Sequence, residues 1–101
     1  MTTLSTHVLD AALGVPAADL EVRLDDEPAT VTDADGRVGR VGEVGPGAHV
    51  LTFATGAWFG AQGRDTFFPS VQIAFEVDPG QEHYHVALLL SPFAYTIYRG
   101  S

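Results

Sequence analysis

The sequence contains no cysteine and no lysine. Without cysteine, the chain has no disulfide framework, no zinc–thiolate site and no cysteine nucleophile. No serine stands in a Gly-x-Ser-x-Gly motif, which excludes the nucleophile elbow of the α/β-hydrolases. No apolar run approaches the roughly 20 residues of a membrane span, and no secretory signal pattern is present. We therefore expect a cytoplasmic protein that does not enter a membrane.

Positive charge is scarce. Five basic residues, all arginine, stand against thirteen acidic ones, and the formal net charge is −8. Nucleic-acid binding requires clustered basic residues that displace counterions, so this balance predicts no nucleic-acid partner. It also works against an anionic membrane surface. A small anionic substrate remains compatible with this charge if the arginines are concentrated where it binds.

Short apolar runs separated by turn signals make up the rest of the chain. With 101 residues, 46% apolar and 18% charged, the composition fits one globular domain over residues 1–101. Apolar runs predict strands over residues 4–10, 20–24, 29–32, 49–54, 71–77, 83–90 and 95–99, and one short helix over 57–62. Seven or eight short strands in a chain of this length predict an all-β sandwich or small barrel.

Histidines occupy the polar face of two predicted strands. In the segment 83–90, His83 and His85 alternate with Tyr84 and Val86, so the histidines point away from the apolar face. His7 has the same relation to its apolar neighbours in the first strand. Imidazole titrates near neutral pH and is the usual general base, although a lone histidine is more often a plain surface residue.

Two further interpretations concern metals and charges. His83 and His85, two residues apart on a strand, can share a ligand face, and His7 or an acidic residue would have to complete a zinc site.

Arg37 follows the turn of residues 33–36, which would aim its side chain. The adjacent pair at 64–65 (Arg-Asp) predicts a surface ion pair of little energetic value.

Four segments together resemble the 5-hydroxyisourate hydrolase family, the hydrolytic relatives of transthyretin. They are residues 4–10 (LSTHVLD), 32–37 (TDADGR), 63–69 (GRDTFFP) and 83–101, which starts HYHVALLLSPF and finishes YRGS. The resemblance implies a two-sheet, transthyretin-like β-sandwich with one short helix. It also implies hydrolysis of 5-hydroxyisourate to 2-oxo-4-hydroxy-4-carboxy-5-ureidoimidazoline in urate catabolism, without a metal or another cofactor. The implied assembly is a homotetramer with active sites at the dimer–dimer interface.

The resemblance also assigns residues. Its catalytic set corresponds to His7, Arg37, His85 and Ser101, and the substrate is expected to contact His7, Arg37, Tyr98 and Ser101. The two histidines would share the acid–base chemistry. Arg37 would orient the substrate and stabilise negative charge, and Ser101 would position water or substrate.

The chain departs from the family pattern at three positions. Ala87 stands where proline is common, Ala94 where glycine is usual, and Ile97 where a small polar residue is common. We expect Ala87 and Ile97 to alter the shape of the channel. The alternative function is a transthyretin-like carrier of a small apolar ligand, which would gain nothing from the polar set of His7, Arg37 and His85.

Overall fold

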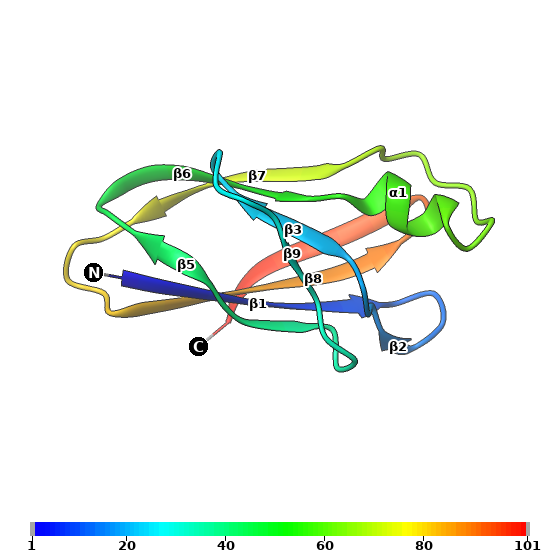
Figure 1. Ribbon diagram of the computed structural model, residues 1–101, viewed down its shortest axis with the longest axis horizontal. Coiled ribbons are helices and arrows are strands. Elements are labelled where there is room, and N and C mark those ends of the chain that lie inside the picture. The colour runs from blue at the N-terminus through cyan, green and yellow to red at the C-terminus, as the bar shows by residue number, and fades with distance from the viewer. Residues whose placement is uncertain (1, 101) are drawn as a thin grey trace.

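The computed structural model describes residues 2–100, which form two β-sheets and one short helix (Figure 1). The elements in chain order are β1 (Thr2–Asp10), β2 (Val15–Pro16), β3 (Glu21–Leu24), β4 (Thr30–Val31), β5 (Arg37–Val44), β6 (Gly47–Phe53), α1 (Thr55–Gly60), β7 (Val71–Val77), β8 (His83–Ser91) and β9 (Ala94–Gly100). The predicted all-β architecture with one short helix is confirmed. Two of the nine strands in residues 2–100, β2 and β5, were not predicted.

The strands form two stacked layers, with α1 at one end (Figure 1). One sheet has the order β2-β1-β8-β9, and β5 also pairs with β1; the other has the order β4-β3-β6-β7. Strands β1 and β8 run parallel, and every other pairing between these strands is antiparallel. The two layers confirm the predicted sandwich.

The hydrophobic core lies between the sheets and follows the period of two of each strand. In β1 every second residue is buried, among them Leu4 and Val8, and in β8 the buried set includes Leu88 and Leu90. Phe53 of β6 packs into the same core from the opposite sheet. Burial of each large apolar side chain stabilises the folded state by about 1.5–3 kcal/mol. The other faces of β1 and β8 are left free to carry polar chemistry.

Strand β5 was not predicted because its pairing with β1 is irregular. Thr6 pairs with Val38, and Leu4 pairs with Gly42. Between these two pairs β1 moves by two residues, whereas β5 moves by four. The additional residues of β5 break the alternation that identifies a strand. Gly42 also approaches the other sheet closely, because a Cβ there would lie 3.1 Å from Leu24 Cδ2.

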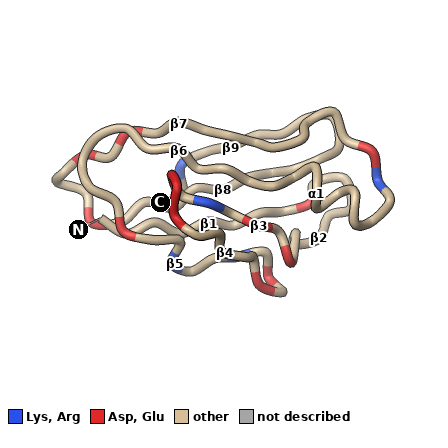
Figure 2. The backbone as a smooth tube through the Cα atoms, turned by 45° about the horizontal axis from the view of Figure 1, so that its top comes forward, with Lys and Arg blue, Asp and Glu red and all other residues tan. Residues whose placement is uncertain are grey.

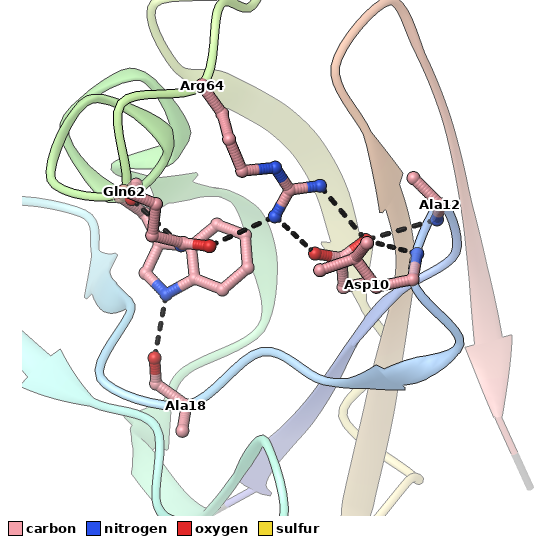
Figure 3. A network of polar contacts seen from close by, with 7 residues as sticks. Asp10, Ala12, Ala18, Gln62 and Arg64 are labelled. Carbon is pink, nitrogen blue, oxygen red and sulfur yellow. Dashed lines mark hydrogen bonds and ion pairs between the residues drawn. The ribbon is translucent and has the colours of Figure 1, made fainter.

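Arg64 pairs with a buried carboxylate. Its Nη1 donates to Asp10 Oδ2 over 2.7 Å, and the Asp10 side chain is fully buried. Asp10 also accepts the backbone N–H groups of Ala12 and Leu13 (Figure 3). Burial acts to raise the pKa of Asp10, but these hydrogen bonds outweigh it and hold the pKa below its ordinary value. The prediction of a surface pair between Arg64 and Asp65 is wrong, because a buried carboxylate needs its partner far more than an exposed one does.

Acidic residues are spread along the backbone and outnumber the basic ones (Figure 2). In the part of the chain from residue 2 to residue 100, α1 is the one helix, and no helix there is long and apolar enough to cross a membrane.

Candidate active site

Four strands bring the predicted residues to one face of the first sheet. In the strand register, His7 of β1 lies beside Arg37 of β5 and beside Ala87 of β8, and Ala87 lies beside Tyr98 of β9. Paired residues project to the same side of a sheet, so these four side chains form one row across it. With strands about 4.8 Å apart, the row spans about 14 Å.

His85 stands in the next row, two residues before Ala87 in β8. Its neighbours there are Ser5 of β1 and Gly100 of β9. From the strand spacing and rise, the backbones of His7 and His85 lie about 8 Å apart. The two histidines, on neighbouring strands, are therefore close enough to contact the same small molecule.

Gly100 provides the space that the His85 ring occupies. A Cβ at position 100 would lie 2.7 Å from His85 Cδ2 and 3.4 Å from His85 Cγ. The first distance is too short for any side chain without movement of the ring. The glycine of the Tyr-Arg-Gly-Ser segment is therefore required for the position of His85.

The turn before β5 orients both Arg37 and His7. Asp33 Oδ1 accepts the backbone N–H groups of Asp35 and Arg37 at 2.9 and 3.0 Å, and Gly36 supplies the left-handed backbone with φ of 76°. His7 Nε2 lies 2.9 Å from the carbonyl oxygen of Asp35. A carbonyl only accepts, so Nε2 carries the proton and Nδ1 is the basic nitrogen of neutral His7. The turn thus fixes the backbone of Arg37 at the start of β5, and the aim of the Arg37 side chain stays a prediction.

His85 is held through one ring nitrogen. Ser5 Oγ lies 2.7 Å from His85 Nδ1 and 2.8 Å from His83 Nε2, and Thr3 Oγ1 lies 2.6 Å from His83 Nδ1. The remaining nitrogen of His85, Nε2, is on the side of the ring away from Ser5.

The surroundings of His85 favour its neutral form. Partial burial lowers the pKa of His85 below its ordinary value, and the positive charges of Arg37, His7 and His83 lower it further. A neutral imidazole at neutral pH can accept a proton from water. The arrangement therefore places a group that can accept a proton on the same face as a guanidinium that can stabilise negative charge.

Of the predicted site residues, four meet on this face: His7, Arg37, His85 and Tyr98. Ser101 lies outside the described residues. Ile97 pairs with Leu88 and packs against the core, so the expectation that it shapes this face is wrong. Residues 2–100 contain no group of three or more His, Cys, Asp or Glu side chains placed to hold a metal ion.

Sequence reasoning missed the roles of Ser5 and Gly100. Their contacts to His85 depend on β1 and β9 flanking β8, and the parallel pairing of β1 with β8 joins segments about 80 residues apart. No local pattern signals such a pairing. A period of two places Ser5 on the same face as His7, which is as far as the sequence leads.

A hollow lies elsewhere on the molecule. It has a volume of about 570 Å³ beside α1 and is lined by Trp58, Leu13 and Asp10 among others, with none of the site residues in its wall. The indole Nε1 of Trp58 donates to the carbonyl of Ala18 over 2.7 Å (Figure 3). The histidine-bearing face is instead an open sheet surface.

Known proteins resemble the chain over nearly its whole length. The HIUase/Transthyretin family matches residues 4–100. A 5-hydroxyisourate hydrolase of Caulobacter vibrioides is 39% identical, and the match covers all of both chains. The structure of Klebsiella pneumoniae 5-hydroxyisourate hydrolase superimposes with a TM-score of 0.90 at 38% identity, covering 99% of this chain and 100% of the other. Sea bream transthyretin in complex with thyroxine gives a TM-score of 0.88 at 29% identity, covering 96% of this chain and 93% of the other.

Proposed function

The chain belongs to the HIUase/Transthyretin family, and we propose that it hydrolyses 5-hydroxyisourate on the face formed by β5, β1, β8 and β9. The enzyme is a cyclic amide hydrolase of urate catabolism, and its fold is that of the hydrolases and transthyretins to which it is similar. The observation that carries the proposal is the meeting of His7, Arg37 and His85 on one open face. The product is 2-oxo-4-hydroxy-4-carboxy-5-ureidoimidazoline.

His85 acts as the base in this proposal. Its Nε2 removes a proton from water, which attacks a ring carbonyl of the substrate, and the C–N bond of that carbonyl then breaks. The lowered pKa of His85 keeps the imidazole neutral and ready to accept the proton. A positioned base of this kind contributes roughly 10²–10⁴-fold to the rate.

Arg37 and His7 act on the substrate. Arg37 stabilises the negative charge that develops on the carbonyl oxygen, for which one well-placed donor contributes about 3–4 kcal/mol. His7, fixed through Nε2–H by its bond to Asp35, acts as the acid once Nδ1 is also protonated: Nδ1–H gives its proton to the departing ring nitrogen, and Nδ1 takes back the proton of the new carboxyl group. Tyr98 contacts the substrate from the far end of the same row, and Ser101 positions water or substrate.

The charge balance of the chain fits this site. A guanidinium and three imidazoles gather near one another on a chain of net charge −8. The chain thus concentrates a guanidinium and polar imidazole groups where a polar, partly anionic bicycle binds. A carrier of an apolar ligand would gain nothing from this concentration, and similar proteins of bacteria and mouse bear the name 5-hydroxyisourate hydrolase.

We further propose one domain over residues 1–101 that assembles into a cytoplasmic homotetramer. Strands β3 and β4 contact β5 on one side of the sandwich, so β7 and β9 end the two sheets on the other. Such edges can pair with a second copy. Phe67 and Phe93 are exposed by 74% and 71%, which adds apolar surface for association. A second pair of chains would close the open histidine face into a channel.

Light scattering after size exclusion tests the tetramer, and a monomer at assay concentration would contradict it.

The activity itself is tested with substrate made in the cuvette. Urate oxidase generates 5-hydroxyisourate, and its ultraviolet decay is followed with and without the protein, in the presence of a chelator. We expect decay much faster than the spontaneous reaction. Decay at the spontaneous rate with a folded protein would reject the hydrolase and favour the carrier. Loss of activity in chelator alone, restored by zinc, would favour a zinc hydrolase that uses His7, His83 and His85.

A further inference from the structure

A continuous chain of hydrogen bonds leads from His85 to an exposed histidine. It runs from His85 Nδ1 to Ser5 Oγ over 2.7 Å, from Ser5 Oγ to His83 Nε2 over 2.8 Å, and from His83 Nδ1 to Thr3 Oγ1 over 2.6 Å. His85 and Ser5 are half-buried, whereas His83 is exposed to solvent. One end of the chain therefore lies at the reacting centre and the other lies in water.

The strand register explains the chain. His83 and His85 project from the same face of β8 and, two residues apart, are roughly 7 Å from each other, too far for a direct hydrogen bond. The parallel register places Thr3 beside His83 and Ser5 beside His85. The short Ser5 side chain can therefore bond to both rings.

The serine hydroxyl makes the chain directional. A hydroxyl has one O–H to donate and lone pairs that accept, so Ser5 donates to one imidazole and accepts from the other. In one arrangement His85 Nδ1–H donates to Ser5, Ser5 donates to His83 Nε2, and His83 Nδ1–H donates to Thr3. In the reverse arrangement every donor and acceptor exchanges roles. Thr3 fits both, because its hydroxyl can donate to His83 Nδ1 or to the carbonyl oxygen of Glu82 at 3.5 Å.

We propose that Ser5 and His83 form a proton relay that carries the proton taken up by His85 to bulk water. This inference rests on the hydrolase function proposed above. Ser5 and His83 touch no reacting atom in it and are positioning residues.

The steps of the relay balance. His85 Nε2 takes a proton from the attacking water, and His85 Nδ1 gives its proton to Ser5 Oγ as Ser5 gives its own to His83 Nε2. His85 is then neutral with its proton on Nε2, and His83 carries two N–H groups and the positive charge. The chain resets after the product leaves: His85 Nε2 loses its proton to water, and His83, reprotonated by solvent, returns a proton through Ser5 to His85 Nδ1. Hydrolysis of a cyclic amide to a carboxylate and an N–H releases one proton at neutral pH, and His83 passes this proton to solvent.

The local charges favour transfer in this direction. The charged groups facing His85 are Arg37 from β5, His7 from β1 and His83 from β8 itself, and its neighbour in β9 is Gly100. A charge on His85 is repelled by Arg37 and partly desolvated. His83 lies beside Thr3, four residues from the row of His7 and Arg37 and thus about 13 Å along the strand, where water solvates the cation.

Three variants and one control test the relay by kinetics. In dilute buffer, Ser5→Ala and His83→Gln should lower kcat about tenfold with KM changed less than twofold, a modest share of a proton-transfer contribution. Ser5→Thr retains a hydroxyl and should stay within about twofold of wild type. Added imidazole should restore kcat of His83→Gln, because a soluble base can replace an exposed one, and a purely structural role of His83 would not respond. His49→Gln removes a histidine of the other sheet and should leave kcat unchanged.

Nitrogen-15 spectra of the histidine rings test the coupling without substrate. In wild type, the Nδ1 and Nε2 shifts of His85 should change when His83 titrates, and Ser5→Ala should abolish this dependence. Unchanged His85 spectra in Ser5→Ala, together with kcat of Ser5→Ala and His83→Gln within twofold of wild type, would overturn the relay while leaving the hydrolase intact. Wild-type protein that does not accelerate decay would instead reject the hydrolase, and the spectra would still report whether the rings are coupled.

Discussion

The imidazole of His85 lies against the backbone of Gly100, so closely that a methyl group at position 100 would come within 2.7 Å of the ring. The contact joins the second histidine of the His-Tyr-His segment to the glycine of the Tyr-Arg-Gly-Ser segment. Two segments that are separate in the sequence are thus one structural unit across β8 and β9.

Gly100→Ala should displace the His85 ring and lower kcat about tenfold to a hundredfold, because a misplacement of about 1 Å in a catalytic group has effects of this size. The measurement is the rate of 5-hydroxyisourate decay. Gly60→Ala is the matched control, since a Cβ at position 60 meets open space. Full activity of Gly100→Ala would show that the ring tolerates a methyl group beside it.

Arg37→Lys should lower kcat/KM about a hundredfold, because a lysine keeps the charge but loses the planar, two-pronged donor. Arg40→Lys, on the same strand at an exposed position paired with Glu43, should have little effect. Both variants are compared in the decay assay. If Arg37→Lys were fully active, orientation of the substrate by a bidentate guanidinium would be ruled out.

The pH dependence follows from the lowered pKa of His85. The base must be neutral to act, so kcat/KM should hold as the pH falls to the ordinary histidine value of 6.5 and decline only below it. Arg37→Gln removes a repelling charge and should raise the pKa of His85, which an NMR titration of the ring measures directly. Arg23→Gln, in the other sheet, should leave that titration unchanged. A downward shift in Arg37→Gln would contradict the assigned cause.

The buried pair of Asp10 and Arg64 should dominate the stability effects of charge removal. Arg64→Ala leaves a buried carboxylate without its cation and should cost about 3 kcal/mol of unfolding free energy. This corresponds to a fall in Tm of at least about 12 °C for a domain of this size. Arg40→Ala breaks an exposed pair and should cost less than about 1 kcal/mol. Equal Tm values for the two variants would mean that burial of the carboxylate makes no difference.

Acid should remove this difference. The pKa of Asp10 is lower in the folded protein than in the unfolded chain, so its contribution is present above the unfolded value of about 3.9. That contribution is lost as the pH falls through the lower, folded value. The gap in Tm between wild type and Arg64→Ala should therefore narrow below about pH 4, which calorimetry over a pH series measures. A gap that stays constant would mean that the ionised carboxylate is not what Arg64 stabilises.

The faces of β1 and β8 were predictable because regular strands alternate strictly. Alternation alone predicts that His7 and His85 lie opposite Val8 and Val86, and both valines are buried in the core. Strand β5 was not predictable, because its glycines and additional residues interrupt the same alternation.

Long-range partners lie beyond local patterns. Nothing near Arg64 indicates Asp10, 54 residues earlier, and the nearest carboxylate in sequence, Asp65, is the wrong partner. Likewise, Ser5 acquires its place between His83 and His85 only through the parallel pairing of β1 with β8. The roles of the site residues came from family resemblance, whereas their contacts came from the fold.

Hydrolysis on the histidine face of the β1–β8 sheet is tested by comparing 5-hydroxyisourate decay for His85→Ala and His49→Ala, both shown to be folded by circular dichroism and Tm. His49 bonds to Asp25 in a different part of the molecule and serves as the matched histidine. We predict a loss of at least about a hundredfold for His85→Ala and wild-type rates for His49→Ala. Equal rates for His85→Ala and wild type would contradict catalysis on this face.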